Sequence, residues 1–324
     1  MPKILFALDG SEASLRAARG LAGILRWWKA TDVEVLNVQP ESLIFSELIP
    51  QSLRERAESR VREAGERALE TAHALLQGAA TRCATTLRFG DAATAIARAA
   101  QMLDCTMIAM GSHGAGAVGS LVTGSVTTKV IHVGFRPVLV IPSERPRTGS
   151  VYGPPRRAAR VLVPVDGSAG ATAALREVLR IASWFQNAPE IHLLAVYEGT
   201  PLDVEIADMV TAEALREHQQ KRFDAALLPA REALSSMASE VIEHTAIGPP
   251  AEKIRAIIET RVFDLVCLGT RGMGAVRNLI LGSTAAKYCA QSTFRSWSFR
   301  RPRPERRLRP PGVVESPCLR WPQP

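Results

Sequence analysis

The chain carries the same sequence pattern twice, and this repeat limits its possible folds more than any other feature. The segment ILFALDGS at 4–11 returns as VLVPVDGS at 161–168, 157 positions later. The segment MGSHG at 110–114 returns as LGTRG at 268–272, 158 positions later. Because two separate segments keep nearly the same spacing, the 324 residues are best explained as a tandem duplication of one domain. The period is far longer than the roughly 20–50 residues of a solenoid repeat.

Each copy alternates short apolar runs with stretches of helical periodicity. The runs are rich in Val, Ile and Leu, as in parallel strands that are buried on both faces. We expect strands near 3–9, 33–38, 83–89, 105–111 and 137–142, and near 160–166, 191–197, 239–246 and 263–269. We expect helices near 11–28, 52–77, 91–103 and 121–133, and near 168–184, 210–236, 248–261 and 280–291. This order predicts an α/β fold with two tandem open parallel sheets flanked by helices. The basic pattern of each sheet has five strands.

One helix start has a local signature of its own. Ser52 is followed three residues later by Glu55, which is the spacing of a capping box. We therefore expect the helix near 52–77 to begin at Ser52.

The second copy breaks the pattern at its end. The first copy closes with the apolar run RPVLVIP at 136–142, whereas the matching place reads FRSWSFRRP at 294–302. Prolines then recur up to Pro324, which excludes a central strand there. We therefore expect the second copy to lack its last strand. The expected division is a first domain at 1–144, a linker at 145–158, a second domain at 159–291 and a disordered Arg/Pro-rich tail at 292–324.

The basic charge of the chain is concentrated in this tail. The net charge is +8, and the eight arginines and two glutamates of 294–324 supply +6 of it. The remainder is nearly neutral, so nucleic acid is not expected as the main partner. Two interpretations of the tail stay open. It is an unselected disordered end, for instance after a change of reading frame, or its arginines bind nucleic acid or another acidic partner while Trp297, Phe299 and Trp321 stack on bases.

Hydrophobic runs, cysteines and histidines indicate where the protein is expected to work. No run reaches the ~20 apolar residues of a membrane helix, and the apolar start at 3–9 is interpreted as a strand rather than a signal peptide. The five cysteines are scattered, and none forms a C-x-x-C pair. We therefore expect a cytoplasmic protein with no membrane partner. The six histidines show no metal-ligand spacing, so no metal site is predicted.

The glycine pattern is the sharpest chemical signal. Both copies contain Gly-x2-Gly-x9-Gly-Ser between an expected strand and an expected helix. These residues are Gly111, Gly114, Gly124 and Ser125 in the first copy and Gly269, Gly272, Gly282 and Ser283 in the second. Glycines let the backbone approach a ligand, and amides at a helix N-terminus attract phosphate oxygens. The alternative is that the glycines only form strand-to-helix turns, but the full spacing, matched twice, favours a phosphate site.

An aspartate ends the first expected strand of each copy. In an open α/β sheet, ligands bind beyond the carboxyl ends of the strands. Asp9 and Asp166 occupy that position, where a carboxylate can accept hydrogen bonds from a nucleoside or help to hold Mg²⁺. The alternative, which the sequence weighs equally, is that each aspartate caps the helix that follows.

These motifs together resemble the universal stress protein family, in its tandem form and its ATP-binding branch. The resemblance rests on the two aspartates and the two glycine motifs, and it covers about 1–142 and 159–291. It implies a Rossmann-like, adenine nucleotide alpha hydrolase-like fold with strand order 3-2-1-4-5. It also implies that the adenosine is held by Ala7, Asp9 and Val38 in the first copy and by Pro164, Asp166 and Val196 in the second. The glycine motifs would then hold the phosphates.

The resemblance implies a stress-response protein that binds ATP, with or without Mg²⁺, as a sensor or regulatory module. No catalytic residue is predicted, and the chain is expected to be at most a weak ATPase. A slow Mg-dependent ATPase and a tail that binds acidic partners remain the alternatives. In the family the fifth strand pairs with its counterpart in a partner domain. The absence of that strand from the second copy leaves both a homodimer and pairing of the domains within one chain open.

Overall fold

The computed structural model describes most of both copies. The described residues are 1–41, 50–112, 124–133, 135–142, 158–199, 210–235, 241–269 and the backbone of 296–299. Residues 145–157 of the expected linker and most of the expected tail lie outside these residues. So do 280–291, where a last helix is expected in the second copy.

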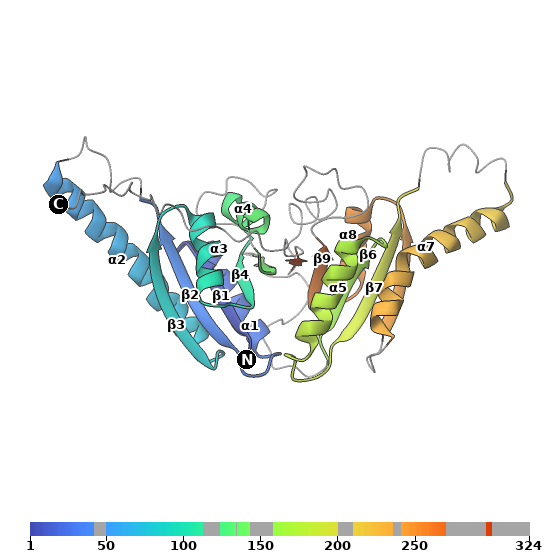
Figure 1. Ribbon diagram of the computed structural model, residues 1–324, viewed down its shortest axis with the longest axis horizontal. Coiled ribbons are helices and arrows are strands. Elements are labelled where there is room, and N and C mark those ends of the chain that lie inside the picture. The colour runs from blue at the N-terminus through green and yellow to red at the C-terminus, as the bar shows by residue number, and fades with distance from the viewer. Residues whose placement is uncertain are drawn as a thin grey trace, which may run out of the picture.

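The first copy alternates strands and helices in the predicted order (Figure 1). Its strands are β1 (Lys3–Leu8), β2 (Asp32–Gln39), β3 (Arg82–Phe89), β4 (Met107–Gly111) and β5 (Val138–Ile141). Its helices are α1 (Glu12–Leu25), α2 (Gln51–Leu76), α3 (Ala92–Met102) and α4 (Ser125–Val133). The positions agree closely with the apolar runs. β1, β4 and β5 are buried and leave little room for alternation, whereas the edge strand β3 has no buried residue.

The second copy repeats this plan. Its strands are β6 (Arg160–Val165), β7 (Glu190–Tyr197), β8 (Val241–Ile247) and β9 (Leu265–Gly269). Its helices are α5 (Ala169–Ala182), α7 (Ala212–Leu234) and α8 (Pro250–Thr260). Ser168 caps α5 and Thr211 caps α7, each by accepting a hydrogen bond from a backbone amide three residues on.

All strands join one sheet with the order β3-β2-β1-β4-β5-β10-β9-β6-β7-β8. The pairs within each copy are parallel, which confirms the order 3-2-1-4-5 for the first copy and the α/β fold for both. The second copy contributes four strands of apolar sequence. In each copy the carboxyl end of the central strand, β1 or β6, lies at the end of the sheet where ligands bind in such folds.

The structure adds one element at the place where the sequence ends its pattern. The backbone of Ser296–Phe299, within the expected tail, forms β10. It pairs parallel with β9 and antiparallel with β5, so the edge of β9 is not bare and the two copies pair within one chain. Trp and Phe favour strands, and a segment between two strand edges completes the hydrogen bonds of both. The composition of the whole tail predicts disorder because of its prolines. These prolines begin only at Pro302, so they do not prevent a strand at 296–299.

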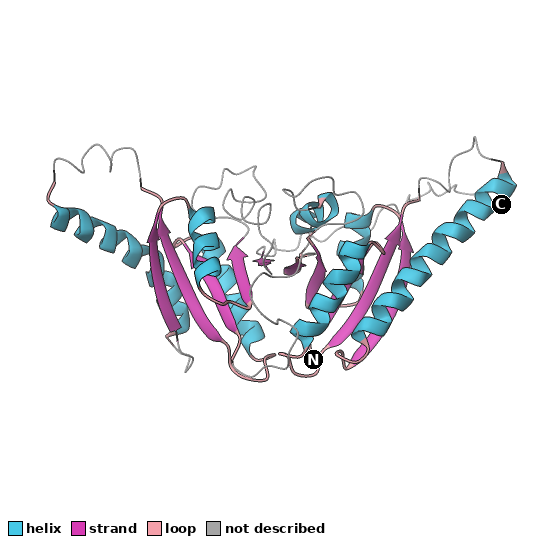
Figure 2. Ribbon diagram, turned by 180° about the vertical axis from the view of Figure 1, so that it is seen from behind, coloured by secondary structure: helices cyan, strands magenta, loops and turns pink. Residues whose placement is uncertain are grey.

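Helices cover both faces of the sheet (Figure 2). In the first copy α1 and α2 pack on one face, and α3 and α4 pack on the other. In the second copy α5 and α7 share a core with α1 and α2 of the first, while α8 covers a separate cluster. None of the helices in the described ranges combines the length and the apolar composition that crossing a membrane requires.

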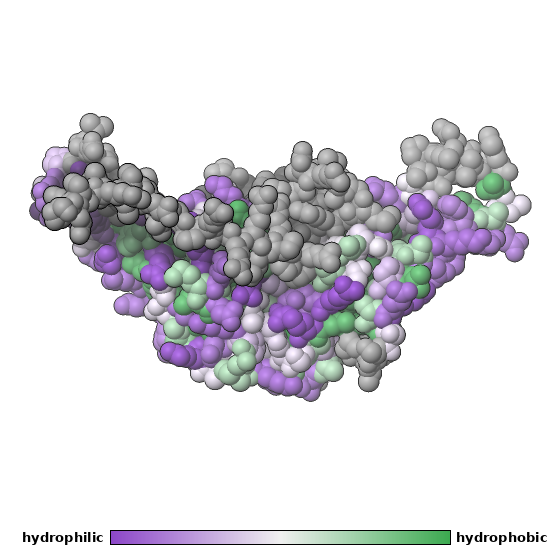
Figure 3. Space-filling model, viewed as in Figure 1, coloured by the Kyte–Doolittle hydropathy of each residue, from purple (hydrophilic) through white to green (hydrophobic). Residues whose placement is uncertain are grey.

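The predicted capping box is wrong. Helix α2 begins at Gln51 after Pro50, and no side chain caps it. Its first half projects away from the sheet, as does that of α7 at the opposite end of the molecule (Figure 1). The buried residues of α2 start only at Gly65, so the start of the helix has no core contact to fix it. The projecting part of α7 is mostly hydrophilic on the face shown in Figure 3.

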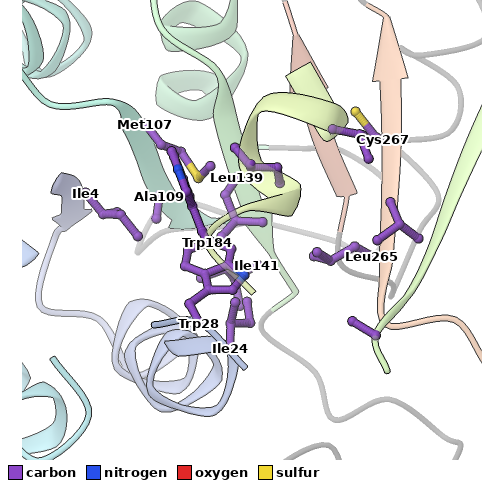
Figure 4. Close-up of a cluster of buried hydrophobic side chains, with 14 of the residues drawn as sticks. Ile4, Ile24, Trp28, Met107, Ala109, Leu139, Ile141, Trp184, Leu265 and Cys267 are labelled. Carbon is purple, nitrogen blue, oxygen red and sulfur yellow. The ribbon is translucent and has the colours of Figure 1, made fainter. Parts of the chain in front are cut away.

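The two copies meet in a shared apolar cluster. Trp28 after α1 and Trp184 after α5 lie in one core with Leu139 and Ile141 of β5 (Figure 4). The cluster continues to Cys267 on β9. Burial of this apolar area stabilises the contact between the copies and the fold of each copy together.

Candidate functional site

The first strand of the first copy ends in a tight turn that carries Asp9. Asp9 Oδ1 accepts hydrogen bonds from Ser11 N at 3.0 Å and from Ser11 Oγ at 2.7 Å. Gly10 between them has φ +81°, a conformation that strains other residues. Ser11 caps α1 through Ser14 N, so the alternative in which Asp9 itself caps the helix is wrong. The aspartate is exposed at the carboxyl end of the central strand.

The second copy builds the same turn. Asp166 Oδ1 accepts a hydrogen bond from Ser168 N at 3.0 Å, and Gly167 has φ +78°. Ser168 caps α5 by accepting from Ala171 N at 3.1 Å. The duplication therefore preserves the turn geometry and the orientation of the carboxylate relative to the following helix.

The two ends of the glycine motif in the first copy lie together. Gly111 ends β4, next to β1 in the sheet. Gly124 N donates to Ser112 O at 2.7 Å, so these two positions lie side by side. Thr127 Oγ1 donates to Gly111 O at 3.0 Å, and Ser112 N donates to Ile141 O at 2.9 Å. These bonds fix the start of α4 beside the end of β4, where its amides face the same edge as Asp9.

Two residues expected to contact adenosine lie on one face of the first sheet. Ala7 is buried and Val38 is half-buried, and both pack with the cluster beneath α3 and α4. Ala7 pairs in register with Leu36 and Met110, which places it between β2 and β4. Ala7, Val38 and Gly111 therefore lie near one another at one end of the sheet.

The second copy differs at the matching positions. Val196 is half-buried and packs on the α8 cluster, but Pro164 takes the place of Ala7 in the central strand. Proline has no N–H to donate. The ladder between β6 and β9 spans two residue pairs and stops before Pro164, whereas the ladder between β1 and β4 spans four. The second site is therefore held by fewer backbone hydrogen bonds than the first.

Gly269 has a structural reason of its own. A Cβ atom at this position would lie 2.7 Å from the backbone of Gly170 and 3.1 Å from Ala171 N, at the start of α5. A glycine is needed there for close packing of β9 against α5, with or without a ligand. The other predicted phosphate residues, Gly114, Gly272, Gly282 and Ser283, lie outside the described residues, while Ser125 is the exposed first residue of α4.

Sequence reasoning missed a buried amide behind the first site. Asn37 on β2 is 0% exposed, and its Nδ2 donates to Leu8 O at 3.0 Å. Gln39 Nε2 donates in turn to Asn37 Oδ1 at 2.8 Å. The signal was present as a polar residue inside the apolar run of β2. This network ties the end of β1, next to Asp9, to β2, and the second copy has Ala195 in the matching place.

Three helices of the first copy begin at this edge of the sheet. Asp91 caps α3 by accepting from Thr94 N at 3.0 Å, and this backbone hydrogen bond holds the pKa of Asp91 below its usual range. Helix N-termini carry partial positive charge, so α1, α3 and α4 together favour an anionic ligand. Arginine and lysine side chains are not required for that preference.

Comparisons with known proteins agree with this architecture. The profile of the family described as the universal stress protein family matches residues 1–142 and 158–294. A universal stress protein of Methanocaldococcus jannaschii is 28% identical over 131 residues, which span 40% of this chain and 74% of the relative.

Solved structures extend the likeness to the tandem arrangement. A universal stress protein from Archaeoglobus fulgidus aligns over 92% of this chain and 98% of its own, with a TM-score of 0.64 and 22% identity. A functionally unknown protein from Pseudomonas aeruginosa aligns over 92% of each chain, with a TM-score of 0.55 and 14% identity. At these identities the two structures establish the shared fold.

Proposed function

Because the chain belongs to the universal stress protein family, we propose that it binds an adenine nucleotide, ATP in the first instance, at the edge of the sheet marked by Asp9. In this proposal Ala7, Asp9 and Val38 hold the adenosine. The turn from Gly111 to Ser125 holds the phosphates through backbone amides and the N-terminus of α4. Bound nucleotide then reports the state of the cell to a partner, and the chain acts as a sensor.

The observation that carries this proposal is the contact between the end of β4 and the start of α4. The hydrogen bond from Gly124 N to Ser112 O brings both ends of the glycine motif to the end of β4, beside the strand that carries Asp9. A carboxylate for the sugar and amides for the phosphates thus share one edge. A simple strand-to-helix turn would not need eleven residues between two positions that are hydrogen-bonded to each other.

The second copy is the weaker candidate for the same role. Asp166 and Val196 match Asp9 and Val38, but Pro164 shortens the ladder beside them. We expect nucleotide to bind the first copy more tightly. If Mg²⁺ accompanies ATP, Asp9 and Asp166 are the carboxylates in the described residues best placed to approach it.

The decisive experiment identifies the ligand of the purified full chain. Mass spectrometry of the small molecules released on denaturation should find an adenine nucleotide at one or two per chain. Calorimetric titration with ATP should then show binding that Asp9→Asn weakens at least about tenfold, since a hydrogen bond to a charged group contributes roughly 1.5–3 kcal/mol.

Asp32→Asn is the matched control. It makes the same chemical change at the opposite edge of the sheet, where β2 begins, and should leave the affinity unchanged. Absence of released nucleotide together with no measurable ATP binding would overturn the proposal. Phosphate release that Asp9→Asn leaves unchanged would count against the alternative of a slow ATPase.

The alternative of binding through the arginine-rich tail needs a revised test. Because β10 pairs with β5 and β9, removing 294–324 would also remove a strand of the sheet. A chain that stops after Phe299 removes the arginines from 300 onward and keeps β10. Salt-sensitive binding of nucleic acid that this truncation abolishes would support the tail as a second binding element, and ATP binding should be unaffected.

A further inference from the structure

The second copy brings two histidines into contact beneath α8. His192 on β7 and His244 on β8 have their rings stacked, with centroids 5.3 Å apart and planes inclined by 3°. His192 Nδ1 lies 3.0 Å from His244 Nε2, which is a hydrogen bond between the rings. His192 is 5% exposed and His244 is half-buried, so the pair is largely shielded from solvent.

The first copy fills the same place with different chemistry. Glu34 on β2 and Thr86 on β3 occupy the positions equivalent to the histidines, because Leu36 pairs with Thr86 as Leu194 pairs with His244. Thr86 Oγ1 donates to Glu34 Oε1 at 2.6 Å. The duplicated domains thus differ at one buried polar contact, and only the second copy has a pair that can take up protons near neutral pH.

Charged groups lie around the pair on β6, on β7 itself and directly after α8. Arg160 of β6 donates through Nε to Glu190 Oε2 of β7 at 2.9 Å, and Arg261 follows α8. Glu190 Oε2 lies 3.6 Å from His192 Nε2, and within the described residues this buried nitrogen has no hydrogen-bond partner. No three His, Cys, Asp or Glu side chains of the described ranges could hold a metal ion, so the pair is not a metal centre there.

The hydrogen bond between the rings exists only while one of the facing nitrogens lacks a proton. The arrangement that suits the surroundings has His192 Nε2–H directed toward Glu190, and His192 Nδ1 accepting from His244 Nε2–H. A first added proton then goes to His244 Nδ1. A second would make both facing nitrogens donors and break the bond, and would leave two like charges 5.3 Å apart beneath α8.

The fold opposes both protonation steps. Burial lowers the pKa of His192 and outweighs Glu190, which raises it, while Arg160 and Arg261 lower it further. Burial lowers the pKa of His244 as well, followed by Arg261 and His192. A histidine with a folded pKa below its unfolded value of about 6.5 contributes stability at higher pH, and that contribution is lost as the pH falls from there through the folded pKa.

We propose that the outer strands β7 and β8 form a proton-sensitive edge, which loosens in mildly acidic solution while the matching strands β2 and β3 of the first copy stay closed. Local opening of an edge strand requires less free energy than global unfolding. The device needs no ligand, and its consequence falls on β7, the strand that also carries Val196. Acid would therefore act on the two copies differently.

Hydrogen exchange of the full chain tests this directly. Peptides from β7 and β8 should exchange at least about threefold faster at pH 5.5 than at pH 7.5, after correction for the intrinsic pH dependence of exchange. Peptides from β2 and β3, which carry Glu34 and Thr86, serve as the internal control and should keep their corrected rates. Equal acceleration in both copies, or none in β7 and β8, overturns the proposal.

A variant separates the histidines from other acid effects. His192→Gln combined with His244→Thr replaces the histidines by an amide and a hydroxyl, which can form a side-chain hydrogen bond at the place of the Glu34–Thr86 contact and cannot take up protons in this pH range, so it should abolish the acceleration. If it persists in this variant, the histidines are not its cause. Should the variant fail to fold, NMR titration of the histidine rings in the native chain decides: both rings titrating near pH 6.5, like a histidine peptide, would contradict the proposal.

Discussion

Trp28 and Phe185 face each other across the junction of the two copies, although 157 positions separate them in the sequence. They form an isolated antiparallel bridge, with ring centroids 6.0 Å apart and planes at 78°. The bonds on either side are reciprocal. Lys29 N donates to Trp184 O at 2.6 Å, and Gln186 N donates to Trp27 O at 2.9 Å. Equivalent segments of the duplicated domains thus bind each other, and together with β10 they hold the copies in one structure.

Trp28→Ala should weaken the whole chain rather than one copy. Trp28 is 2% exposed in the shared core, and its truncation should lower the free energy of unfolding by about 3–5 kcal/mol. Trp28→Phe is the matched control, because the second copy already has Phe185 there and the indole Nε1 has no hydrogen-bond partner among the described residues. It should cost no more than about 1.5 kcal/mol. Urea unfolding followed by far-UV circular dichroism measures both, and equal losses would contradict the role of the junction.

The order and positions of the elements could be predicted because the buried parallel strands are mainly apolar runs. Lys3–Leu8 and Met107–Gly111 are such runs, and both lie within a residue or two of the predicted positions. Contacts between distant segments were not predictable in this way. The bridge between Trp28 and Phe185 depends on how two domains dock, and β10 depends on strand edges that only the folded sheet presents.

The candidate site was predictable at the level of residue types. Asp9 and Gly111 lie at the same edge because parallel strands end there together. The detail was not predictable: the sequence left open whether Asp9 binds a ligand or caps α1, and the structure gives the capping role to Ser11. The role of Asn37 was not predicted, because a single polar residue in an apolar strand does not indicate its hydrogen-bond partner. Nucleotide binding by these residues stays a prediction.

Gly269→Ala should destabilise the second copy even without ligand. The new methyl group would lie 2.7 Å from the backbone of Gly170, and neither segment can yield without shifting β9 or α5. Such overpacking typically costs about 1–3 kcal/mol. Gly78→Ala, where nothing lies within 4 Å of the added atom, should be neutral or stabilise by up to about 1 kcal/mol. Thermal unfolding compares the two, and an equally mild effect at Gly269 would show that the turn can relax.

The buried thiols should resist alkylation in the native chain. Burial raises the pKa of Cys105 to about 11, so at pH 8 only about one such thiol in a thousand is ionised. Burial raises the pKa of Cys267 well above its usual range, and Glu177 adds to that effect. Peptide mass spectrometry after iodoacetamide treatment should find both unmodified, with slow labelling of the half-buried Cys83. All three should react in urea, and rapid native labelling of Cys105 or Cys267 would show that the core opens.

Asn37→Ala should loosen the first site from behind. The change removes the hydrogen bond to Leu8 O and leaves the amide of Gln39 without its acceptor Asn37 Oδ1, at a cost of roughly 1–3 kcal/mol. Asn187→Ala makes the same substitution at an exposed position and should stay within about 0.5 kcal/mol of the native chain. Because Leu8 directly precedes Asp9, the amide network also positions the turn that carries the carboxylate. Chemical unfolding gives the stability of each variant. Titration with ATP, at a temperature where each variant is fully folded, shows whether the affinity falls as well. A variant that unfolds like the native chain would mean that water replaces the amide at little cost, and that Ala195 in the second copy is no disadvantage there.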